Sequence, residues 1–164
     1  MALVLVRVDC RLIHAQILES WIPQTRSDYL VVANDQIIYN DLRRDIMTLA
    51  VPPEIEVAFL PVEEAARELG HVRYFDRRVA LLLANCPDAL RIYQAGLNFK
   101  RLNLGNLSFS PPKTQVTGSV ALDERDMVSL CKLEAGGVLI DLRNNPSDVS
   151  PPFSEVCACF PTST

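Results

Sequence analysis

Short apolar runs of strand length alternate along the chain with segments whose apolar residues recur at helical spacing. The run from Val79 to Ala84 is apolar throughout, as expected of a strand that is covered on both faces of a parallel sheet. Ile13, Ile17 and Trp21 instead recur every four residues and predict one face of a helix. This alternation predicts an α/β fold: a single domain whose mostly parallel central sheet is flanked by helices on both faces.

The same pattern predicts the other elements. Strands are expected over residues 3–8, 29–33, 55–60, 79–84, 100–104 and 138–142. Helices are expected from residue 13 to Pro23, over 36–50, over 63–69, from Asn85 to Gly96, and from Asp123 to Gly136. The helix over 36–50 should bury an apolar stripe formed by Ile38, Leu42, Ile46 and Leu49.

The C-terminal end has a different composition. Prolines and serines are frequent after Asn144, which predicts a loosely ordered tail. We therefore divide the chain into a domain of residues 1–145 and a Pro- and Cys-containing tail of residues 146–164.

Composition narrows the possible functions. The 164 residues can bury a full core, and the net charge of −4 argues against binding to nucleic acid. The apolar runs are too short to span a membrane, so we expect a cytoplasmic protein. The five cysteines are irregularly spaced, and neither a dinucleotide-binding nor a P-loop glycine motif is present. The missing glycine motifs disfavour binding of dinucleotides and ATP.

The loop after the first strand concentrates the candidate chemistry. It contains Asp9, Arg11 and His14, the last of which is one of only two histidines. The first turn of a helix favours anions, and an arginine could bind an anion at the same place. A neutral imidazole beside such a site can attack phosphorus. The alternative is that His14 simply faces solvent next to an ordinary turn.

This stretch resembles a known signature, R-[IV]-D-D-R-L-I-H-G-Q, of the IIB components of the mannose/fructose/sorbose class of the bacterial phosphoenolpyruvate-dependent sugar phosphotransferase system (PTS). The agreeing positions are Arg7, Val8, Asp9, Arg11, Leu12, Ile13, His14 and Gln16. Weaker similarities to the family follow at Trp21, at residues 63–65, at residues 103–106 and at residues 119–120.

The resemblance implies an activity, protein-N(π)-phosphohistidine–sugar phosphotransferase. His14 would accept a phosphoryl group on Nδ1 from a IIA component and pass it to a hexose bound by the membrane components IIC and IID. Because the histidine itself would be the carrier, we expect no metal and no organic cofactor. Arg11 and backbone amides of residues 10–16 would stabilise the phosphoryl group, and Asp9 would orient the site. The protein would associate peripherally with the membrane through IIC and IID and could form a homodimer.

Two positions depart from the signature. Cys10 replaces its second aspartate, and Ala15 replaces the glycine after the histidine. These departures leave a second hypothesis open, a regulatory phosphoacceptor or interaction module that keeps the fold but has no role in sugar transport. Ser108 and Ser119 lie on later loops that could face the same site.

Overall fold

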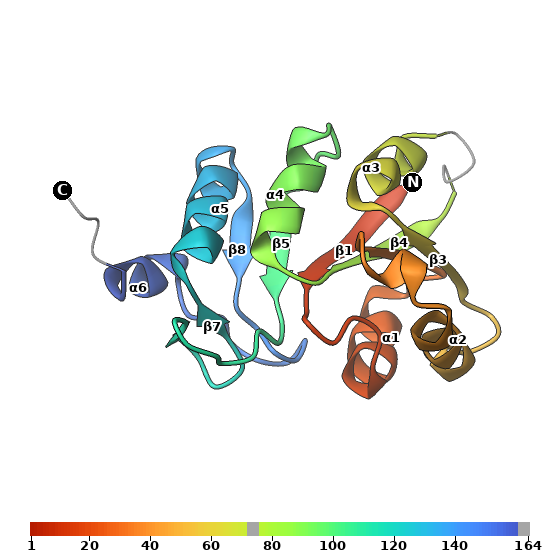
Figure 1. Cartoon of the computed structure of the whole chain (residues 1–164), viewed down its shortest axis with the longest axis horizontal. Coiled ribbons are helices and arrows are strands. Elements are labelled where there is room, and N and C mark those ends of the chain that lie inside the picture. The colour runs from red at the N-terminus through yellow and green to blue at the C-terminus, as the bar shows by residue number, and fades with distance from the viewer. Residues whose placement is uncertain (72–75, 161–164) are drawn as a thin grey trace.

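The computed structural model describes residues 1–71 and 76–160 and contains a six-stranded parallel sheet (Figure 1). The strand order is β3-β2-β4-β1-β5-β8, and each neighbouring pair is parallel. The strands are β1 (Ala2–Val8), β2 (Tyr29–Ala33), β3 (Glu56–Leu60), β4 (Arg78–Leu83), β5 (Arg101–Leu104) and β8 (Leu139–Asp141). The predicted fold class is therefore confirmed, and every expected strand is present to within two residues at either end.

Helices cover both faces of the sheet (Figure 1). One face carries α1 (Ile22–Thr25) and α2 (Asp41–Ala50), and the other carries α3 (Val62–Leu69), α4 (Cys86–Gln94) and α5 (Glu124–Ala135). Each face encloses its own hydrophobic cluster. A small antiparallel pair, β6 (Thr114–Gln115) and β7 (Ala121–Leu122), lies within the long connection before α5.

Local sequence explains where the later helices begin. The Asn85 side chain accepts a hydrogen bond from the amide of Asp88 and caps α4. Asp123 and Asp126 form a reciprocal capping box at the start of α5. These caps satisfy backbone donors that would otherwise have no intrahelical partner.

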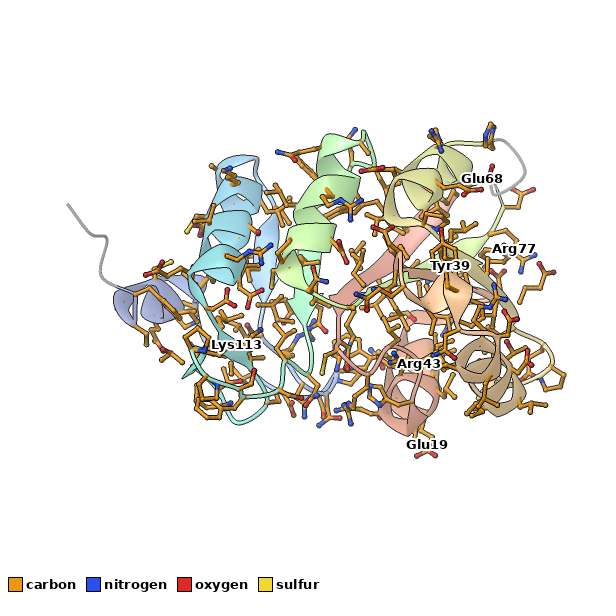
Figure 2. All side chains as sticks on the ribbon, viewed as in Figure 1. Glu19, Tyr39, Arg43, Glu68, Arg77 and Lys113 are labelled. Carbon is orange, nitrogen blue, oxygen red and sulfur yellow. The ribbon has the colours of Figure 1, made fainter. Side chains whose placement is uncertain are left out.

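The first helical segment differs from its prediction. We expected Pro23 to end this helix, which is wrong, because the helical turns continue through Pro23 to Thr25. A π-helical turn, η1 (Ile17–Trp21), precedes α1 and places Pro23 in the first turn of α1, where a proline is tolerated. Ile17 and Trp21 are buried as predicted, whereas Glu19 points away from the body of the protein (Figure 2).

The expected helix over 36–50 is two elements, and its predicted apolar stripe is wrong for the three residues that lie on α2. A 3₁₀ turn, η2 (Ile37–Tyr39), ends at Asn40, whose non-helical backbone and capping side chain start α2 afresh. This break changes the phase of α2 relative to the sheet, so that Met47 is its buried side chain. Three of the four residues of the expected stripe are instead exposed, namely Leu42, Ile46 and Leu49, at 71%, 58% and 86%. The fourth, Ile38, lies in the 3₁₀ turn and is half-buried against the core.

The expectation of a loosely ordered tail is also wrong for the described part of the C-terminal segment. Residues 153–158 form a short helix, α6 (Phe153–Ala158). Phe153 and Val156 are buried in the larger hydrophobic cluster. The Ser150 hydroxyl accepts a hydrogen bond from the amide of Leu142, at the end of β8. Residues 161–164 lie outside the described residues.

Candidate active site

The candidate site lies at the carboxyl end of β1, in the middle of the sheet. In open α/β sheets, ligands bind beyond the carboxyl ends of the strands, where connections diverge to opposite sides. Here β1 lies between β4 and β5. The loops that follow β1 and β5 are joined, because the amide of Cys10 donates to the carbonyl of Asn106 at 2.9 Å and Gly105 donates to Val8 at 2.9 Å.

The Asp9 carboxylate is the centre of the site. Its side chain is fully buried. Oδ2 lies 3.0 Å from His14 Nε2 and accepts a hydrogen bond from an Arg7 terminal nitrogen at 3.0 Å. Oδ1 accepts from the backbone amide of Arg11 at 3.1 Å. The structure therefore brings the three predicted site residues together, with Arg11 and His14 each in contact with Asp9.

The ionisation of Asp9 determines the tautomer of His14. Burial raises the pKa of Asp9, but the hydrogen bond with His14 and the charge of Arg7 outweigh burial, so that the pKa lies below its ordinary value. An ionised carboxylate can only accept hydrogen bonds, so the proton of a neutral imidazole sits on Nε2 of His14. The Nδ1 atom therefore carries the free lone pair. The side chain of His14 is 15% exposed.

Arg11 is the accessible cation of the site. Its side chain is 46% exposed, which makes it the arginine of this group that an incoming anion can reach. Its Nε lies 3.4 Å from Asp9 Oδ1, and a terminal nitrogen donates to Gln16 Oε1 at 3.1 Å. Arg11 and His14 thus both contact the Asp9 carboxylate, His14 at 3.0 Å and Arg11 more distantly.

Arg7 is a part of the site that our sequence reasoning missed. Its fully buried side chain donates to Asp9, and a terminal nitrogen donates to Asn103 Oδ1 at 2.5 Å. Burial lowers the pKa of Arg7, and Asp9 opposes that effect. Its guanidinium carbon lies 5.1 Å from the centre of the Trp21 ring, within reach of a cation–π contact. An arginine within an apolar strand, at a position of the signature, is the signal that could have identified it.

Gly105 leaves the space that Arg7 occupies. A Cβ atom at this position would lie 2.0 Å from Cζ of Arg7, far inside any real contact. Gly105 follows β5, within the 103–106 turn that resembles the family. A glycine there lets the guanidinium pass directly against the backbone.

The backbone carbonyl of Asn144 joins the C-terminal segment to the site. It accepts hydrogen bonds from Trp21 Nε1 at 3.0 Å, from Gln16 Nε2 at 3.1 Å and from Arg7 at 3.3 Å. No sequence pattern indicates this contact, because every residue has the same carbonyl group.

Cys10 contacts Ser108, one of the two candidate serines, whereas Ser119 takes part through its backbone. The Cys10 sulfur lies 3.3 Å from the Ser108 hydroxyl and accepts a hydrogen bond from Asn106 Nδ2 at 3.4 Å. Ser108 is thus beside the loop of the site. The backbone carbonyl of Ser119 accepts a hydrogen bond from Leu107. Cys10 therefore faces the loop after β5, whereas Asp9 supplies the carboxylate that both arginines of the motif contact.

The described part of the chain offers neither a metal site nor a membrane span. Over residues 1–71 and 76–160, no group of three or more His, Cys, Asp or Glu side chains could hold a metal ion. Within the same ranges, no helix has the length and apolar character needed to cross a bilayer.

Relatives with similar sequences include several PTS proteins. The family model for "PTS system sorbose subfamily IIB component" matches residues 3–160. A fructose-specific EIIB component of Bacillus subtilis is 31% identical over 156 residues, which cover 95% of this chain and 96% of the relative. A sorbose-specific EIIB component of Klebsiella pneumoniae is 32% identical over 92% of both chains. The chain spans 46% of the mannose-specific EIIAB component of Escherichia coli, at 30% identity.

Solved structures agree with these similarities. The crystal structure of the IIBSor domain of the Klebsiella pneumoniae sorbose permease superimposes with a TM-score of 0.91 and 30% identity, covering 96% of this chain and 98% of that chain. The match to the family model runs to residue 160, so it includes α6 in the C-terminal segment. On this evidence, the chain belongs to the sorbose subfamily of PTS IIB components, within the mannose/fructose/sorbose class indicated by the β1 loop.

Proposed function

We propose that this chain is a phosphohistidine carrier in which His14 receives a phosphoryl group and passes it on. The observation that carries the proposal is the 3.0 Å contact between His14 Nε2 and a buried, ionised Asp9. That contact keeps the proton on Nε2 and leaves Nδ1 as the nucleophile.

The transfer follows from this arrangement. The Nδ1 lone pair forms a bond to phosphorus as the bond between phosphorus and the donor's nitrogen breaks, so that no water is consumed. The imidazole gains positive character when phosphorylated, and the Asp9 carboxylate at Nε2 stabilises it. The Nε2 proton stays in place throughout. In the onward step the bond between Nδ1 and phosphorus breaks as a hydroxyl oxygen of the acceptor bonds to phosphorus, and that hydroxyl gives up its proton on the acceptor's side.

Arg11 and the start of the helix supply positive potential for the phosphoryl oxygens. The amides of Cys10, Arg11 and Leu12 already donate to Asn106, to the Asp9 carboxylate and to the Asp9 carbonyl. The amides of residues 13–16 at the helix start are therefore the ones we assign to the phosphoryl group.

The proposed partners follow from the family. We infer that a IIA component donates the phosphoryl group and that a hexose bound by IIC and IID accepts it, with this chain working in the cytoplasm beside the membrane. The names of the similar proteins include EIIAB and EIIB components of PTS permeases, which supports partners of this kind. The reaction is then that of a protein-N(π)-phosphohistidine–sugar phosphotransferase.

The central test replaces the nucleophile. Incubation with a phosphorylated IIA protein should place an acid-labile phosphate on the wild-type chain, and His14→Ala should abolish it because the accepting nitrogen is gone. His71→Ala is the matched control, since His71 is the other histidine and lies exposed beside Glu68. Undiminished labelling of His14→Ala, measured by 32P transfer, would refute the assignment.

A second experiment separates transport from regulation. Membranes carrying IIC and IID with a bound hexose should remove the phosphate from His14 if the chain serves sugar transport. Cys10 motivates the alternative, because its sulfur contacts Ser108 and Asn106 where the signature has an aspartate. A phosphorylated chain that is inert toward such membranes, yet binds another protein selectively, would favour the regulatory phosphoacceptor.

A further inference from the structure

Arg11 is held mainly by one neighbour, Gln16. Its contact with Asp9 Oδ1, at 3.4 Å, is at the long limit of a hydrogen bond. Its contact with Gln16 Oε1, at 3.1 Å, is the shorter of the two side-chain contacts. Because the Arg11 side chain is 46% exposed, the position of its guanidinium depends on what holds Gln16.

The amide of Gln16 has a fixed direction. Its Nε2 donates to the carbonyl of Asn144 at 3.1 Å and to Oδ1 of Asn145 at 2.8 Å, while its Oε1 accepts from Arg11. A flipped amide would place a donor against the guanidinium and an acceptor against two acceptors. The segment after β8 therefore determines which atom of Gln16 faces Arg11.

That segment is itself anchored on both sides. The amide of Asn145 donates to Oδ2 of Asp148 at 2.7 Å, and the carbonyl of Asn145 accepts from the amide of Asp148 at 3.1 Å. On the other side, Arg143 donates to Asp141 at 2.7 Å and lies 5.6 Å from the centre of the Trp21 ring. Asn145 is thus a fixed acceptor at the rim of the site.

We propose that Asn145 is a positioning residue for phosphoryl transfer, which acts through Gln16 to hold the Arg11 guanidinium beside His14. This inference rests on the proposed function, because it assigns a task to Arg11. An exposed arginine loses conformational freedom when it binds an anion, and ordering it beforehand removes part of that cost. The C-terminal segment thereby becomes part of the phosphoryl-transfer site.

A double-mutant cycle tests the proposal. Asn145→Ala should lower the rate of His14 phosphorylation at saturating phosphorylated IIA by about three- to tenfold, the effect of losing one hydrogen bond. In an Arg11→Ala background, Asn145→Ala should cause no further loss, because the group that it positions is gone. Ser147→Ala, an exposed change in the same turn, serves as the control. An equal loss in both backgrounds would show a merely structural role and overturn the proposal.

A second readout needs no phosphate. In the unphosphorylated protein, the Nε–H group of Arg11 should show a lower heteronuclear NOE in Asn145→Ala than in the wild type or in Ser147→Ala. If IIA fails to label the wild type, the proposed function fails, whereas this NMR comparison still decides whether Asn145 orders Arg11. An unchanged Arg11 signal would overturn the inference even if His14 is phosphorylated normally.

Discussion

Asp9 has two tasks that a single carboxylate can combine. It neutralises the fully buried Arg7 and holds the proton of His14 on Nε2. A buried pair that loses one member leaves an uncompensated charge in the interior. Asp9 therefore stabilises the loop and, under the proposed function, also sets which nitrogen of the imidazole reacts.

The Asp9→Asn variant should reveal how much the ionised Asp9 carboxylate stabilises the folded protein, because that contribution depends on pH. Because the pKa of Asp9 is lowered in the folded protein, its stabilisation is fully present above the unfolded pKa of about 3.9 and is lost as the pH falls through the folded value. At pH 7 the variant should lose roughly 3–5 kcal/mol in the free energy of unfolding. Urea denaturation from pH 7 to pH 3 should show this difference narrowing below about pH 4.

Asp45→Asn, on the exposed side of α2, is the control for a general loss of negative charge. The interpretation of Asp9 would be contradicted if both variants gave the same dependence on pH.

The close contact between Gly105 and Arg7 leads to a second prediction at the scale of single residues. Gly105→Ala should destabilise the protein by roughly 1–3 kcal/mol, because the new methyl group would overlap Arg7. The guanidinium cannot move aside cheaply, since Asp9 and Asn103 hold it. Gly118→Ala is the matched control, because a methyl group there would have no neighbouring atom within 4 Å. Equal urea midpoints for the two variants would contradict the account of Arg7.

At this scale the sequence indicated the proposed phosphoacceptor and its immediate neighbours. Asp9, Arg11 and His14 stand within six residues, so a short motif could place them on one loop. Arg7 and Asn103 meet across two strands and are linked only by the pairing of β1 with β5. Local patterns carry little information about such a contact.

At the scale of elements, α2 shows how a cap can override an apolar pattern. Asn40 interrupts the expected helix, and the stripe predicted for the core faces outward after the break. Whether a helical face is buried depends on how its axis meets the sheet, which the spacing of apolar residues alone does not determine.

Substitutions on α2 should follow the observed burial. Met47→Ala removes a buried side chain and should cost roughly 2–5 kcal/mol. Leu49→Ala should change stability by no more than about 0.5 kcal/mol, because Leu49 is 86% exposed. Thermal denaturation of both variants would check this order, and the orientation of α2 would be contradicted if Leu49→Ala were the more costly change.

At the scale of the whole molecule, the C-terminal segment is part of the folded unit. Phe153 and Val156 complete the core, and the Asn144 carbonyl contacts the helix and strand on either side of the loop after β1. Alternation along the chain predicted the parallel sheet because its central strands are buried on both faces. Composition misled us about residues 146–160, because polar, proline-rich segments can pack when only a few apolar side chains reach a core.

The molecule should therefore unfold in one step. Trp21, the single tryptophan, lies close to the guanidinium groups of both Arg7 and Arg143 and so reports on contacts with both ends of the chain. Its fluorescence and the far-UV circular dichroism should give coincident transitions in urea. An early fluorescence change at constant dichroism would show that the C-terminal segment detaches before the sheet unfolds.

The contact made by Asn144 has a consequence for how this site can be studied and how it can vary. Its accepting atom belongs to the main chain, so an alanine scan retains it and would not detect the contribution of that carbonyl. Only replacement of the peptide linkage itself, or a change in the number of residues between Asp141 and Asn145, would displace the oxygen from Trp21, Gln16 and Arg7. We expect this short connection to tolerate changes of side chain more readily than changes of length.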